Sequence, residues 1–154
     1  MQNQVKTNTR LAFIQFIFST FFSKKELIDE TKDFQNYFYK LSIPSTKSNK
    51  ETVMNFNKNY FNKLSMIYLE FLKKNDAEKI INPLINFDRK FKNWSIINKS
   101  IILAIFSEIE LTKRDKIKIL INDYFDISKS LISKKEIGMI NAITDKYINE
   151  KEKN

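Results

Sequence analysis

Three residues near the start of the chain carry side chains that can hold a nucleic acid. Arg10, Gln15 and Phe18 fall on or near one face of a predicted helix, and Arg10 and Phe18 are about two turns apart. A guanidinium can fork onto a phosphate, an amide can pair with a base edge, and an aromatic ring can stack on an unpaired base. The alternative is structural, with Phe18 in the core and Arg10 as a solvated helix start. For Phe18 alone we favour the core, whereas Arg10 and Gln15 together favour contact with a ligand.

The residue composition gives little support to a catalytic or metal-binding function. The chain has no Cys and no His, so it lacks disulfides, thiolates, the commonest general base and the commonest metal ligand. Acidic pairs occur at Asp29 with Glu30 and at Glu108 with Glu110, but acids on a helix of a charged protein are ordinarily solvated. We therefore expect a protein that is not an enzyme and needs no cofactor or metal.

The charge balance points to an anionic partner. A formal net charge of +9 on 154 residues is large, and it makes nucleic acid or an anionic membrane surface the natural partner class. Part of this charge can serve solubility alone. The apolar run from Leu11 to Phe22 is too short to span a membrane and is interrupted by Gln15. We expect a cytoplasmic protein without a membrane partner.

Turn residues are scarce, which favours helices. One Gly and two Pro cannot supply the turns of an all-β fold of this length. Three Ser-x-x-Glu capping boxes predict helix starts at Ser23, Ser48 and Ser133, and Asn75 and Thr112 are looser candidates.

Between these starts the apolar residues recur at intervals of three and four, which is helical spacing. This pattern predicts helices at about residues 8–22, 24–41, 49–73, 76–90, 95–111, 113–131 and 134–150. The expected fold is all-α, with about seven helices in one domain over residues 1–154.

Two prolines mark expected interruptions. The segment Ile43-Pro44-Ser45-Thr46 predicts a loop after the second helix, because Pro donates no backbone hydrogen bond. Pro83 falls inside an apolar pattern, so it either kinks the fourth helix or occupies the first turn of a shorter one.

The first helix also carries a recognisable motif. The stretch Thr9-Arg10-Leu11-Ala12-Phe13-Ile14-Gln15-Phe16-Ile17-Phe18 resembles the opening helix of the NusB family, with its Arg, its Ala and its Gln-Ala-Leu-Tyr segment. Arg10, Ala12 and Gln15 match, and Phe18 stands where Tyr is usual.

The last third of the chain resembles the same family. Ile121-Asn122-Asp123-Tyr124, Asp126-Ile127-Ser128-Lys129 and Gly138-Met139-Ile140-Asn141-Ala142-Ile143-Thr144-Asp145-Lys146 are similar, without a gap in spacing, to its Ile-Asn-Glu, Glu-Leu-Ala-Lys and Val-Asn-Gly-Val-Leu-Asp segments. Upstream, Trp94 followed by Ile102-Leu103-Ala104 and Glu108-Ile109 is similar to the family helix in which Trp precedes Ile-Leu-Arg and Tyr-Glu-Leu.

The resemblance implies a fold and a function. NusB proteins have two small helical bundles packed together, and they act in transcription antitermination within the transcription complex. They pair with the ribosomal protein NusE, bind the boxA single strand of ribosomal RNA transcripts, and occur as monomers or homodimers. The residues that the resemblance assigns to RNA binding are Lys6, Arg10, Gln15, Phe18, Lys129, Lys134 and Lys135.

The sequence departs from the family at points that bear on RNA. Only Lys6 and Arg10 stand where the family often has a cluster of arginines, Leu103 replaces an Arg, and Leu131-Ile132 replaces Phe-Gly. Two alternatives therefore stay open. One is a stand-alone NusB-like RNA-binding module that is accessory to ribosomal RNA processing or modification. The other is a helical scaffold that binds protein alone.

Overall fold

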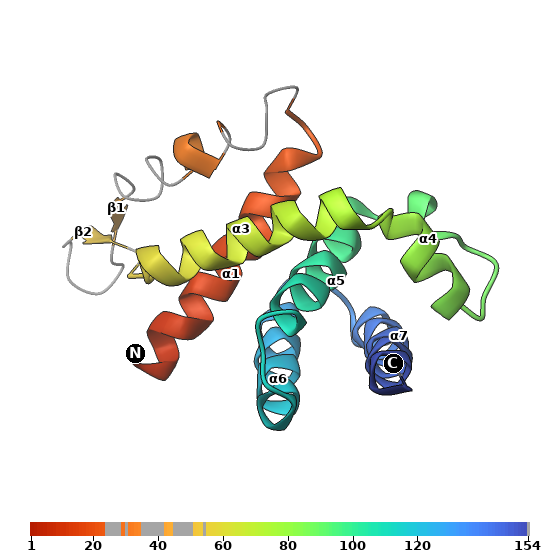
Figure 1. The fold of residues 1–154 in the computed structure, drawn as a ribbon. Helices are drawn as coiled ribbons and strands as arrows, with labels where there is room; N and C mark the ends of the chain where they lie inside the picture. The colour runs from red at the N-terminus through yellow and green to blue at the C-terminus, as the bar shows by residue number, and fades with distance from the viewer. Residues whose placement is uncertain (24–28, 30, 35–41, 45–50, 54, 154) are drawn as a thin grey trace.

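Helices dominate the structure, a computed structural model that describes residues 1–23, 29, 31–34, 42–44, 51–53 and 55–153 (Figure 1). The α-helices are α1 (Asn3–Thr20), α3 (Lys58–Lys74), α4 (Ala77–Ile81), α5 (Ile96–Ile109), α6 (Ile117–Ser128) and α7 (Lys134–Lys153). Short 3₁₀ helices are η1 (Asn82–Leu84), η2 (Phe91–Asn93) and η3 (Arg114–Lys116). Residues 29 and 31–34 are also helical. The expected all-α class is confirmed.

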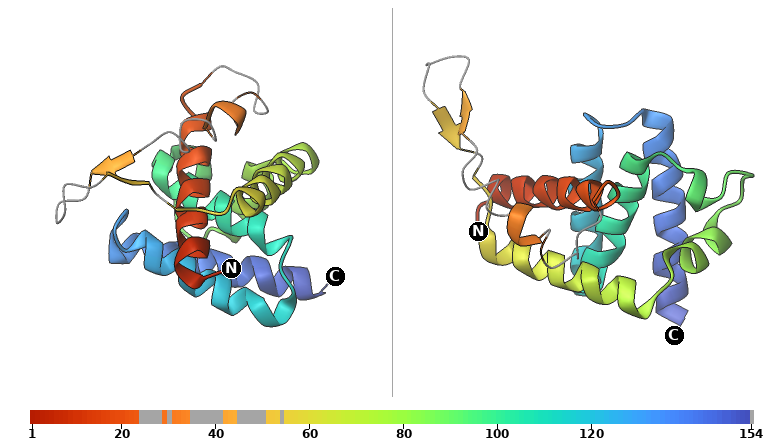
Figure 2. Two further views of the ribbon diagram at one scale, coloured as in Figure 1. Left: turned by 90° about the vertical axis from the view of Figure 1, so that its left-hand side faces the viewer. Right: turned by 90° about the horizontal axis from the view of Figure 1, so that it is seen from above.

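A small hairpin departs from the expectation. Strands β1 (Ser42–Pro44) and β2 (Glu51–Val53) pair antiparallel, with Ile43 opposite Thr52. The predicted loop at residues 43–46 thus begins with strand residues, and Ser45 and Thr46 lie outside the described residues. In both views of Figure 2 the strands lie to one side of the helices.

The third helix begins later than predicted, and Ser48 itself lies outside the described residues. Glu51 belongs to β2, and α3 begins only at Lys58. The side chain of Asn57 caps α3 by accepting a hydrogen bond from the backbone N–H of Tyr60 at 2.8 Å. The β-branched residues Thr52 and Val53 suit a strand, and this local preference overrides the capping pattern. The capping box that starts at Ser23 reaches beyond the described residues.

The fourth helix is much shorter than predicted. Helix α4 ends at Ile81 and continues as η1, which has Pro83 in its first turn. Proline cannot donate the backbone hydrogen bond that a longer helix needs at this point. The cap is Asp76, which accepts from the N–H of Glu78 at 3.0 Å, whereas Asn75 ends α3. Thr112 likewise caps nothing, because its hydroxyl donates to the backbone oxygen of Glu108.

The last helices begin where the sequence predicted. Ser133 and Glu136 form the predicted capping box of α7, with the Ser133 N–H donating to the Glu136 carboxylate at 3.1 Å and the Glu136 N–H donating to the Ser133 hydroxyl at 3.2 Å. Helix α5 starts after Ser95, whose hydroxyl accepts from the Asn98 N–H at 3.4 Å.

Helix α5 is the centre of the molecule. It contacts α1, α3, α6 and α7, and most of its residues are buried, as expected for a helix that is apolar nearly all round. Helices α6 and α7 are seen nearly end-on in Figure 1, and α1 and α3 lie across them. Edge-to-face rings join α1 to α3, with Phe16 and Phe61 centroids 5.8 Å apart. Within the described residues, no helix is long and apolar enough to cross a membrane.

Candidate nucleic-acid interface

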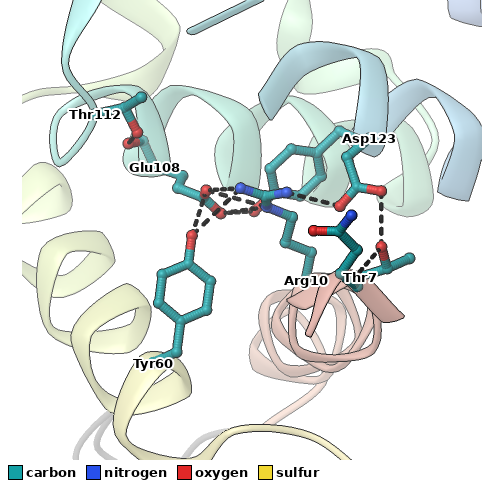
Figure 3. Close-up of polar contacts among 8 residues, drawn as sticks. Thr7, Arg10, Tyr60, Glu108, Thr112 and Asp123 are labelled. Carbon is teal, nitrogen blue, oxygen red and sulfur yellow. Dashed lines mark hydrogen bonds and ion pairs between the residues drawn. The ribbon is translucent and has the colours of Figure 1, made fainter. Parts of the chain in front are cut away.

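Arg10 lies in a buried network of polar side chains (Figure 3). Only 5% of the residue is exposed. Its Nη2 donates to Glu108 Oε2 at 2.6 Å, its Nε donates to both carboxylate oxygens at 3.1 Å, and its Nη1 donates to Asp123 Oδ2 at 2.7 Å. The network therefore ties α1 to both α5 and α6.

Two tyrosines complete the shell around Glu108. The hydroxyl of Tyr60 donates to Oε2 at 2.6 Å, and that of Tyr124 donates to Oε1 at 2.8 Å. The Arg10 guanidinium also lies 5.6 Å from the centroid of the Tyr124 ring, in a cation–π contact. Both oxygens of this carboxylate are thus saturated, which is the condition under which a buried charge is tolerated.

The network raises the pKa values of Arg10, Tyr60 and Tyr124. Burial disfavours the charge of Arg10, but hydrogen bonding and attraction to Glu108 outweigh it, so the pKa of Arg10 is raised still further. Burial, followed by the negative charge of Glu108, raises the pKa of Tyr60 and of Tyr124. At neutral pH Arg10 is therefore a fixed cation, and Tyr60 and Tyr124 are neutral phenols.

The structure does not place Arg10 at a solvated helix start, because its guanidinium donates to Glu108 and Asp123 and the residue is buried. The expected contact of Arg10 with RNA stays a prediction. The structure also corrects the expectation that Glu108 is solvated, since only 1% of it is exposed. Glu108 lies inside the apolar run from Ile101 to Ile109. Because buried charges are rarely unpaired, this position predicts a buried residue of opposite charge beside it.

The other expected RNA residues are more accessible. Gln15, Lys129, Lys134 and Lys135 are exposed, and Lys6 is half-buried with its Nζ 5.8 Å from the centroid of the Tyr60 ring. The exposed fraction of Phe18 is 36%, and its ring lies 5.1 Å from that of Phe22. Our preference for Phe18 in the core is therefore wrong.

Expected residues lie near both ends of α5, Lys6 and Arg10 near its carboxyl end and Lys135 near its amino end. Lys6 and Arg10 line a hollow of about 670 Å³ near Glu108, at the carboxyl end of that helix. At its amino end, Lys99 Nζ lies 5.8 Å from the Phe21 ring that follows α1, and Asn98 Nδ2 donates to Glu136 of α7 at 2.6 Å. Neighbouring residues of α5 thus contact both the end of α1 and the start of α7.

The sequence analysis missed Lys99. It reaches the backbone oxygen of Lys92 at 2.9 Å and lies near two aromatic rings, those of Phe21 and Phe91. Its sequence context, a lysine in the first turn of a predicted helix, gave no indication of these contacts. Among the described residues no cluster of three or more His, Cys, Asp or Glu side chains could hold a metal ion.

The fold and these side chains define a mainly helical protein of the all-α class, with lysines at helix ends and a buried ion network. Curated proteins named transcription antitermination protein NusB are similar to nearly the whole chain. One from Rickettsia felis is 25% identical over 96% of this chain and 94% of the relative. Another from Rickettsia bellii is 27% identical over 94% and 90%, and one from Rickettsia rickettsii is 24% identical over 94% and 92%.

No family model matches the chain. The relatives nevertheless extend over both chains almost from end to end, with identities of 23–27%. The chain is therefore similar to NusB proteins over nearly its whole length, and the resemblance seen in its motifs is confirmed.

Proposed function

We propose that this protein is a transcription antitermination factor that binds the boxA element of ribosomal RNA transcripts together with NusE. The observation that carries the proposal is the end-to-end similarity to proteins of that name, over 94–96% of this chain. The formal charge of +9 supports it, because phosphate attraction scales with exposed Lys and Arg. The protein acts by binding and catalyses no reaction.

The proposed RNA surface consists of the accessible candidates. They are Lys6, Gln15, Phe18, Lys129, Lys134 and Lys135. Lysines supply phosphate contacts with little sequence choice, and Phe18 offers a ring to an unpaired base. Arg10 has a positioning role in this proposal, since its contacts with Glu108 and Asp123 hold α1 in place.

Partner binding supplies the specificity. A basic helical surface alone attracts single strands weakly, and a second protein adds surface until a short sequence is held selectively. We therefore expect weak binding of boxA RNA by this protein alone and tighter, sequence-selective binding after NusE is added.

The test is fluorescence anisotropy of a labelled boxA strand, with and without NusE, at low and moderate salt. A scrambled strand of equal length is the matched control. Tighter binding of boxA than of the scrambled strand in the presence of NusE supports antitermination. Binding that is absent, or equal for both strands with and without NusE, rejects it in favour of a scaffold that binds protein alone.

A further inference from the structure

A groove at the start of α7 has an exposed aromatic ring and hydrogen-bond acceptors in its lining, which suit a flat ligand that donates hydrogen bonds. It has a volume of about 760 Å³ and lies between the segment that precedes α5 and the first turns of α7. Its lining is mainly apolar and includes Phe87, Trp94 and Met139. Phe87 is 38% exposed, and its ring stacks on that of Trp94 with centroids 6.3 Å apart.

One residue that lines the groove has a buried acceptor without a donor. Asn98 lines it and is only 6% exposed. Its Nδ2 donates to Glu136, but its Oδ1 is buried and accepts no hydrogen bond from any described residue. A buried amide oxygen in this state costs free energy, so a ligand N–H that reaches it gains a hydrogen bond at little expense.

A second acceptor lies beside the first. The carboxylate of Glu136 accepts from Asn98 and from Ser133, and these hydrogen bonds lower its pKa, so it stays ionised. An ionised carboxylate and a free amide oxygen together favour a ligand edge that presents N–H groups. The ring and amino N–H groups of a nucleobase present such an edge, and the ring itself can stack on Phe87.

Two cations at the groove favour a nucleotide over other flat donors. Arg89 and Lys135 line the groove and are exposed, so they can pair with the phosphates that flank a base. Lys135 also belongs to the proposed RNA surface, which makes the groove continuous with that surface.

We propose that this groove receives one unpaired base of a bound RNA strand, stacked on Phe87 and donating to Asn98 and Glu136. The inference rests on the proposed RNA-binding function and adds a base-binding site to it. Stacking a base on an aromatic side chain contributes on the order of 1 kcal/mol or more, which corresponds to about a fivefold change in affinity.

The single tryptophan of the chain provides the readout, because Trp94 lies in the groove. Unlabelled single-stranded RNA is titrated into the full-length protein while Trp94 fluorescence is followed, and anisotropy of a labelled strand measures total binding. Polyphosphate, which carries the charge without bases, is the matched probe. We expect RNA to quench Trp94 and polyphosphate to leave its fluorescence unchanged.

Variants separate the groove from the rest of the surface. Phe87→Ala should weaken RNA binding about fivefold and abolish the quenching, whereas Phe87→Tyr, which keeps the ring, should retain both. Met66→Ala removes another exposed apolar side chain, 59% exposed on α3, and should change neither. Circular dichroism checks that each variant is folded.

Two outcomes overturn the inference, and they are distinguishable. RNA that binds by anisotropy without quenching Trp94, and that binds Phe87→Ala equally well, rejects the groove as a base site but leaves the proposed function standing. RNA that fails to bind at all, alone or with NusE, rejects both.

Discussion

Arg10 and Glu108 are 98 positions apart in the sequence, yet they form a buried ion pair between α1 and α5. The pair is forked, with Nη2 at 2.6 Å from Oε2 and Nε at 3.1 Å from each carboxylate oxygen. Tyr60 and Tyr124 donate to the same carboxylate, so none of its charge is left without a partner. This arrangement makes Arg10 part of the scaffold that carries the proposed RNA surface.

Removal of Arg10 should destabilise the protein strongly. Arg10→Met leaves Glu108 buried without its cation, and breaking a buried pair in this way costs about 3–5 kcal/mol. Urea denaturation measures the loss of unfolding free energy. Since the side chains of Arg114 and Glu152 are 80% and 38% exposed, Arg114→Met should cost less than about 1 kcal/mol. Equal losses in the two variants would show that the Arg10 network contributes no more than a surface pair.

A double variant tests the same network from the other side. Arg10→Met combined with Glu108→Leu removes both charges, so we expect part of the stability lost in Arg10→Met to return. A double variant with a lower unfolding free energy than Arg10→Met would contradict this.

The exposed lysines should control the salt dependence of RNA binding. Lys134→Ala and Lys135→Ala should each reduce the slope of log affinity against log salt by about 0.7, because each removes one phosphate contact with a single strand. Lys63→Ala removes the same charge from the exposed side of α3 and should leave the slope unchanged. Anisotropy titrations over a series of salt concentrations give the three slopes. An equal reduction of the slope by Lys63→Ala would show that only the net charge of the protein matters, and not the position of the lysine.

The stabilising contribution of Glu136 should be lost in acid. Hydrogen bonds from Asn98 and Ser133 lower its pKa in the folded state below its ordinary value, which is about 4.3. The unfolded chain therefore takes up this proton first, and the stabilisation is full above about pH 4.3 and disappears as pH falls through the folded pKa. Glu136→Gln should be less stable than the parent at neutral pH, and the difference should shrink at acidic pH.

Thermal melts across this pH range compare the parent with Glu136→Gln. Glu150→Gln serves as control, because Glu150 is an exposed acid on the same helix. A difference between the parent and Glu136→Gln that stays constant with pH would contradict the proposed linkage.

Gly138 should be replaceable with a gain in stability. It lies exposed within α7, and a Cβ added there meets no atom within 4 Å. Gly138→Ala should raise the unfolding free energy by about 0.5–1 kcal/mol, since alanine loses less backbone entropy in a helix. Ala142→Gly, at an exposed position of the same helix, should lower it by a similar amount. Destabilisation by Gly138→Ala in urea denaturation would mean that this helix needs a glycine.

The sequence predicted helix starts correctly where the capping residue and its partner are only a few residues apart. Ser133 begins α7 as its capping box predicted, and α5 begins close to the predicted residue 95, because a helix start depends on neighbours along the chain. The same reasoning predicted a helix from about residue 49, but Glu51 pairs with Pro44 in the hairpin. Strand pairing is a contact between segments, and a capping pattern carries no information about it.

The sequence by itself determined the all-helical class, the basic charge and the resemblance to NusB proteins, since these follow from composition, periodicity and motif order. Only the tertiary structure decided that Arg10 is buried, that Phe18 is exposed, and that Lys6 and Lys135 lie near opposite ends of α5. Periodicity shows which residues share a face of a helix. It does not show which other helix covers that face, because packing between distant segments determines whether a charged residue meets a buried partner or solvent.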